Sequence, residues 1–180
     1  MMTVVHANDP TTQVLSLLYE SRRDVACRIT EASGNGAVAR GLREADCVMM
    51  LGHGNPYGLF STPEKDGRYR RFLVTDRHVQ FLRNKTCIGI WCYANEFALR
   101  YGLEGLFSGM IISELQEAMD LDIPTTREEI DREMEKFTQR LRWCIETTEL
   151  KEVPERMKEL DDIHSPLTSF NYNNLFYCSP

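Results

Sequence analysis

The chain has 180 residues, of which 42% are apolar and 27% are charged, an ordinary balance for a globular domain. The net charge of −6 argues against a nucleic-acid partner. The N-terminal residues lack the features of a signal peptide, and no apolar run approaches the roughly 18 residues that cross a bilayer. We therefore expect a single domain over residues 1–180, cytoplasmic and without a membrane partner.

Short apolar runs alternate with helical patterns along the first 120 residues. Strands are predicted over 3–7, 24–30, 47–51, 86–91 and 107–112. Helices are predicted over 11–22, 37–45, 75–83, 95–101 and 113–120. Strands that alternate with helices indicate a parallel sheet with helices on both faces. The sequence therefore predicts an α/β fold, a three-layer sandwich whose core lies in residues 3–120.

Two further segments complete the predicted fold. Between the third and fourth strands, 58–61 and 68–74 are predicted as the arms of a β-hairpin insertion around the turn at 62–67. The surrounding segment 55–74 could gate the substrate or form a dimer contact, and both interpretations stay open. Beyond Pro124, two helices within 124–163 and an edge strand over 173–178 bring the mostly parallel sheet to about six strands.

The six cysteines form no CxxC pair, so no zinc-ribbon or thioredoxin motif occurs. Cys27, Cys47 and Cys87 lie in apolar strand-like runs, where we expect free thiols that pack as small core residues. No ligand spacing supports a metal site, and no glycine-rich motif for a dinucleotide is present. We therefore expect no metal and no cofactor.

Reactive side chains follow two of the buried strands. His53 comes after the strand at 47–51, and Cys92 after the strand at 86–91. Ligands of open α/β sheets bind beyond the carboxyl ends of the strands, and neighbouring strands lie only about 4.8 Å apart. An imidazole at this position can generate a nucleophilic thiolate from Cys92. Gly54, which lacks a side chain, and the amide of Cys92 could supply donors for a developing oxyanion.

The pattern of an apolar strand with His53-Gly54, a hairpin and a helix, and an apolar strand with Cys92 resembles the clan CD cysteine peptidases. This group includes the caspases, metacaspases, legumains, gingipains, separases and CHAT-domain proteases, and the bacterial CHAT-like branch is the most similar. The resemblance covers about residues 3–120. It implies a caspase-like sheet and an endopeptidase that hydrolyses peptide bonds through an acyl-enzyme.

Carried over to this chain, the resemblance implies His53 and Cys92 as the catalytic dyad and the amides of Gly54 and Cys92 as the oxyanion hole. Because the loop after the first strand often shapes the specificity pocket in this family, Asn8 and Asp9 are candidate substrate-binding residues. An Asp in that pocket would favour Arg or Lys at P1, the residue before the cleaved bond. The implied partner is a peptide or protein substrate, and a homodimer is possible.

The residues around Cys92 depart from the usual Gln-Ala-Cys-x-Gly of caspases, because Trp91 precedes the thiol and Ala94 replaces the glycine. Trp91 is therefore also a candidate contact of the substrate. Two alternatives stay open. The first is a catalytically inactive binding or signalling module on the same fold, with Trp91 blocking the cleft. The second, less favoured because a phosphate-binding loop is missing, is a flavodoxin-like domain that binds a small phosphorylated ligand.

Overall fold

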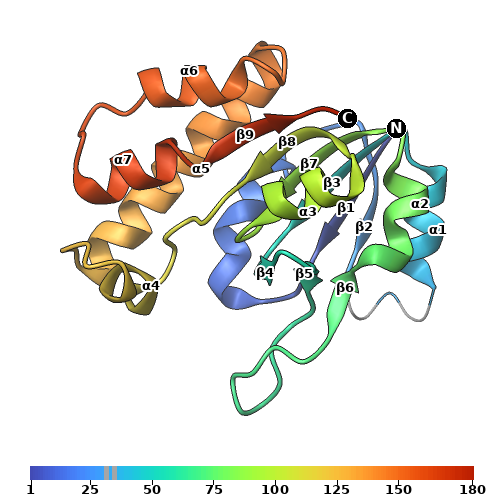
Figure 1. The fold of residues 1–180 in the computed structure, drawn as a ribbon, viewed down its shortest axis with the longest axis horizontal. Helices are drawn as coiled ribbons and strands as arrows, with labels where there is room; N and C mark the ends of the chain where they lie inside the picture. The colour runs from blue at the N-terminus through green and yellow to red at the C-terminus, as the bar shows by residue number, and fades with distance from the viewer. Residues whose placement is uncertain (31–32, 34–35) are drawn as a thin grey trace.

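A six-stranded sheet of order β2-β1-β3-β7-β8-β9 forms the centre of the computed structural model, which describes residues 1–30, 33 and 36–180 (Figure 1). Its strands are β1 (Met2–His6), β2 (Val25–Ile29), β3 (Cys47–Leu51), β7 (Thr86–Ile90), β8 (Glu104–Ser108) and β9 (Leu175–Cys178). The first five are parallel, and β9 runs antiparallel to β8 at the edge. The predicted α/β class with a mostly parallel sheet of about six strands is confirmed.

Helices cover both faces of this sheet (Figure 1). One face packs against η1 (Pro10–Leu18), α4 (Leu115–Asp120), α5 (Arg127–Thr147), α6 (Val153–Glu159) and α7 (Pro166–Tyr172). The other packs against α1 (Ala37–Glu44), η3 (Asp76–His78) with α2 (Val79–Leu82), and α3 (Ala94–Tyr101). Met49 and Leu51 of β3 point to the first core, whereas Val48 and Met50 point to the second. Burial on both faces is the reason that β3 reads as a continuous apolar run.

A small antiparallel sheet joins β3 to α2. Its strands are β4 (Gly54–Asn55), β5 (Gly58–Phe60) and β6 (Phe72–Val74). β5 pairs with both neighbours, so the segment predicted as two arms has a third, short strand directly after His53. The loop between β5 and β6 extends away from the central sheet (Figure 1).

The strand predicted over 107–112 is wrong in its bounds. β8 is Glu104–Ser108, and its Gly105 lies so close to β7 that a Cβ would be 1.8 Å from the carbonyl oxygen of Cys87. Only glycine permits this approach, which sets the register of the two strands. Ile111 and Ile112 are buried, but in a loop beneath the helical layer. An apolar run alone does not distinguish a buried loop from a strand.

Other local predictions also differ from the structure. The helix predicted over 11–22 is the shorter 3-10 helix η1, and α7 was not predicted although Ser165 and Pro166 are strong helix-start signals. Cys27 is exposed, contrary to prediction, because β2 is an edge strand whose middle residues face solvent, whereas Cys87 is buried.

The connection between the predicted strand at 24–30 and the predicted helix at 37–45 includes residues 31, 32, 34 and 35, which lie outside the described residues. Within the described part of the chain, no helix is long and apolar enough to cross a membrane.

Candidate functional site

The register of two neighbouring strands brings His53 and Cys92 to the same edge of the sheet. Leu51 at the end of β3 pairs with Ile90 at the end of β7, and the amide of Gly52 donates to the carbonyl of Ile90 at 3.1 Å. His53 and Cys92 each follow two residues after this pair, and both line one pocket. The parallel pairing that the sequence predicted is therefore the feature that places the imidazole near the thiol.

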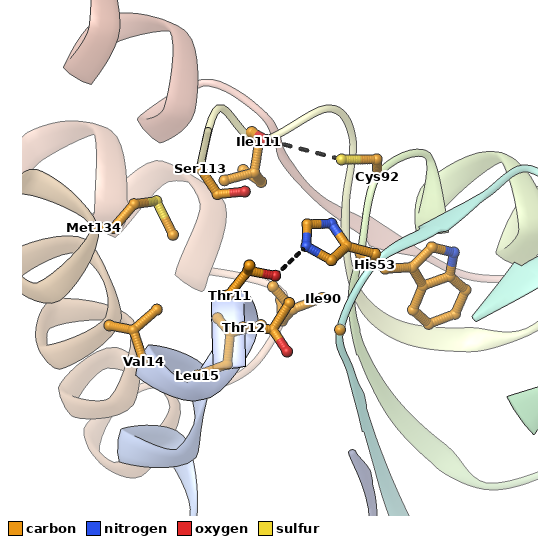
Figure 2. Close-up of a pocket in the computed structure, with 12 residues that line it drawn as sticks. Thr11, Thr12, Val14, Leu15, His53, Ile90, Cys92, Ile111, Ser113 and Met134 are labelled. Atoms are coloured by element: carbon orange, nitrogen blue, oxygen red, sulfur yellow. Dashed lines mark hydrogen bonds between the residues drawn. The ribbon is translucent and has the colours of Figure 1, made fainter. Parts of the chain in front are cut away.

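A chain of side-chain hydrogen bonds holds His53 from the N-terminal end of η1, which follows the neighbouring strand β1. The Nε2 atom of His53 lies 2.9 Å from the hydroxyl of Thr11, at the start of η1 (Figure 2). That hydroxyl donates to Oδ1 of Asp9 at 2.8 Å. Asp9 also accepts the amide of Thr11 at 3.0 Å and caps the helix. The sequence did not predict Thr11 as a contact of His53.

The same chain of bonds fixes which nitrogen of His53 carries a proton. A threonine hydroxyl has one hydrogen, and Thr11 gives it to the carboxylate of Asp9. The Thr11 oxygen can then only accept from Nε2–H of His53. Nδ1 of the neutral ring is left as the acceptor, the role that a general base needs.

Burial alone would raise the pKa of Asp9, but hydrogen bonds from Thr11 and Tyr69 and the nearby His53 lower it below its ordinary value. The hydroxyl of Tyr69 donates to Oδ2 of Asp9 at 2.8 Å, and its ring lies 5.3 Å from the imidazole of His53. Tyr69 comes from the loop between β5 and β6, and only the structure brings it here. Oε1 of Glu114 lies 3.8 Å from the same Nε2 atom of His53 that contacts Thr11.

The thiol of Cys92 contacts groups other than His53. Figure 2 shows its sulfur directed to the carbonyl of Ile111, at 3.8 Å. The second partner of Sγ is Oε1 of Glu117, at 3.9 Å. No hydrogen bond joins Cys92 to His53 among those of the described residues. Of the two candidate residues, His53 is held in place by hydrogen bonds, whereas the thiol of Cys92 faces other partners.

This environment opposes ionisation of the thiol. Burial, and then the negative charge of Glu117, raise the pKa of Cys92 from 9.0 to about 12. Glu117 is itself fixed, because its Oε2 accepts the amides of Ser113 at 2.8 Å and Glu114 at 3.0 Å. A cysteine paired with an imidazole would show the opposite shift. In this conformation Cys92 is therefore a protonated thiol at neutral pH, and not the thiolate that the sequence predicted.

The two amide N–H groups proposed for the oxyanion hole, those of Gly54 and Cys92, donate no hydrogen bond within the described part of the small sheet. The amide of Phe60 donates to the carbonyl of His53 at 2.8 Å, so Gly54 and Leu59 form a non-hydrogen-bonded pair, whose N–H groups point away from the partner strand. The amide of Cys92 makes no hydrogen bond to any described residue. Tyr93, the next residue, has a left-handed φ of 67°, a conformation that is uncommon outside glycine.

Trp91 lies in the core rather than across the cleft. Its side chain is 2% exposed, packs with Phe97 in the core on the α1–α3 face, and donates from Nε1 to the carbonyl of Asn55 at 3.2 Å. A Cβ on Gly54 would lie 2.1 Å from the indole. Gly54 is thus required by the close approach of Trp91, a reason that the sequence did not reveal.

The two residues predicted in the specificity pocket, Asn8 and Asp9, have different surroundings. Asn8 is exposed, whereas Asp9 is 3% exposed and both of its carboxylate oxygens accept hydrogen bonds.

No cluster of three or more His, Cys, Asp or Glu side chains suited to a metal ion occurs among residues 1–30, 33 and 36–180. No protein-family model matches the sequence, and no curated protein is significantly similar to it.

Proposed function

We propose that the protein is a cysteine endopeptidase of the clan CD type, with Cys92 as nucleophile and His53 as base. The observation that supports this most is the register of β3 and β7, which sets His53 and Cys92 side by side beyond paired strand ends and at one pocket. The fixed Nε2–H of His53 supports the same role, since it leaves Nδ1 to accept a proton.

The reaction follows from these groups. Nδ1 of His53 takes the thiol proton as the sulfur of Cys92 bonds to the peptide carbonyl carbon, and the oxyanion is bound by the amides of Gly54 and Cys92. The C–N bond then breaks, and His53 returns the proton to the leaving amine. Water next attacks the thioester, giving its proton to His53, and the acid product leaves with the thiol restored. Peptide and water are the only reactants.

This chemistry requires one movement. The sulfur of Cys92 must turn from Ile111 and Glu117 towards His53, a rotation of a single side chain. Both partners that hold it belong to the segment 109–117, which also carries Glu114 beside His53. A shift of this segment on substrate binding would release the thiol.

Cleavage of a diverse peptide library by the wild type, Cys92→Ala and His53→Ala tests the proposal. Since general acid–base catalysis contributes about 10²–10⁴-fold, we expect His53→Ala to lose at least about 100-fold in rate and Cys92→Ala to be inactive. His164→Asn, at an exposed imidazole far along the chain, is the matched control and keeps full activity. Cleavage that persists in Cys92→Ala would refute the assignment.

A second candidate function is a catalytically inactive binding module. The environment of the Cys92 thiol favours it, because the thiol contacts Glu117 and its pKa is raised. The rate of Cys92 alkylation by iodoacetamide, followed by mass spectrometry as the pH is raised, separates the two. A folded protein whose thiol stays unreactive to about pH 9, and which cleaves no peptide, would be the binding module.

A further inference from the structure

The pocket at the dyad is almost wholly apolar. It is small, with a cavity volume of about 30 Å³, which is room for roughly two water molecules. Leu15 of η1, Ile90 of β7, Ile111 and Met134 of α5 form its walls, and His53 and Cys92 line it too (Figure 2). A side chain placed in this pocket therefore lies beside the reacting sulfur.

No charged partner for a substrate is available inside this pocket. None of its described lining residues is Asp, Glu, Lys or Arg. Apart from His53 and Cys92, its polar side chains carry hydroxyls, and that of Thr11 is already shared between Asp9 and His53. Asp9, which would have to receive a basic P1 side chain, is occupied by Thr11 and Tyr69 on its two oxygens. A charged group that entered the pocket would lose its water without gaining a partner.

We infer that the enzyme selects substrates with a medium-sized aliphatic residue, Val or Leu, at P1, rather than the basic residue that Asp9 suggested. The inference rests on the proposed function, because it makes the pocket beside Cys92 the binding site of the acyl-side residue. Burial of the aliphatic side chain against Leu15, Ile111 and Met134 supplies the binding energy. The limited volume disfavours the larger aromatic side chains.

Four peptidyl acyloxymethyl ketones that differ only in P1 (Leu, Phe, Arg and Asp) test this directly. The thiolate of Cys92 displaces the carboxylate of the probe and forms a thioether, which intact-protein mass spectrometry counts. We expect the Leu probe to label Cys92 at least about tenfold faster than the others, the size of discrimination that apolar pockets achieve. Fastest labelling by the Arg or Asp probe would overturn the inference while leaving the peptidase intact.

Failure of the peptidase itself has a different signature, in which no probe labels Cys92 of the folded protein or labelling is unchanged in His53→Ala. Either result removes the proposed function and the inference with it.

A pair of variants adds a second measurement of the P1 preference. Val14→Asp puts a carboxylate on the pocket wall, and we expect at least a tenfold shift of preference from Leu towards Arg.

Gln13→Asp is the control for this shift, because it adds the same charge to η1 at the neighbouring residue, which is exposed and does not line the pocket. It should leave the P1 preference unchanged. An equal shift in both variants would mean that the added charge acts at a distance, and would overturn the assignment of this pocket to P1.

Discussion

The two halves of the candidate dyad are held in opposite ways. His53 is fixed from the start of η1 by the Asp9–Thr11 pair and has a defined tautomer. Cys92 lies at the equivalent position beyond β7, but its thiol contacts the segment 109–117 and has a raised pKa. His53 is already arranged to accept a proton, whereas the surroundings of Cys92 favour the protonated thiol.

This difference locates the control of the proposed reaction. Strand register alone brings both side chains to one edge, so the register cannot distinguish the resting state from the reactive one. The deciding contacts come from the loop and helix after β8, where Glu117 faces Cys92 and Glu114 faces His53. Substitutions on each side should therefore have opposite effects on the reactivity of the thiol towards substrate.

The largest effect is expected on the His53 side. Thr11→Val keeps the shape of the side chain but removes the hydroxyl, so the Nε2–H of His53 loses its acceptor and the ring its fixed tautomer. We expect a loss of about tenfold in kcat, with little change in KM, because one positioning hydrogen bond is worth about 1 kcal/mol or more near a charged group. Peptide cleavage assays measure both constants.

Thr11→Ser restores the hydroxyl and is the matched control for this prediction. It should recover most of the activity. A Thr11→Val enzyme with wild-type kcat would mean that His53 needs no such support, and the contrast between the two halves of the dyad would disappear.

A smaller effect, of opposite sign, is expected on the Cys92 side. Glu117→Gln keeps an oxygen to accept the amides of Ser113 and Glu114 but removes the negative charge beside the thiol. The pKa of Cys92 should fall, and its alkylation by iodoacetamide at about pH 8 should rise roughly threefold to tenfold, since one pKa unit changes the thiolate fraction tenfold.

Glu114→Gln serves as the control, because Glu114 lies next to His53 and only adds a weaker contribution to the pKa of Cys92. The rate of Cys92 alkylation should change less in Glu114→Gln than in Glu117→Gln. Equal rates in the wild type and Glu117→Gln would show that burial alone keeps the thiol protonated.

The smallest effect concerns stability in acid. Because the pKa of Asp9 in the folded protein lies below its unfolded value, the ionised carboxylate stabilises the fold above about pH 4, and this stabilisation is lost as the pH falls through the folded-state value. Asp9→Asn should therefore show a flatter dependence of the free energy of unfolding on pH in that acid range, measured by urea denaturation. Asp120→Asn, on the exposed part of α4, should keep the wild-type slope.

The sequence by itself determined the alternation of strands and helices, the parallel pairing, and the position of His53 and Cys92 beyond two buried strands. These follow from local signals: apolar runs of strand length, glycines and helix caps. It failed at β8, where a buried loop reads like a strand, and at Cys27, where an edge strand exposes a thiol that the pattern would bury.

Only the tertiary structure decided what surrounds the two reactive side chains. The contact between Thr11 and His53 joins residues 42 positions apart, and that between Tyr69 and Asp9 joins residues 60 apart. The same holds for Glu117, which raises the pKa of Cys92 from another element. Hydrogen bonds and desolvation depend on atoms within a few ångströms in space, and a local pattern carries no record of them.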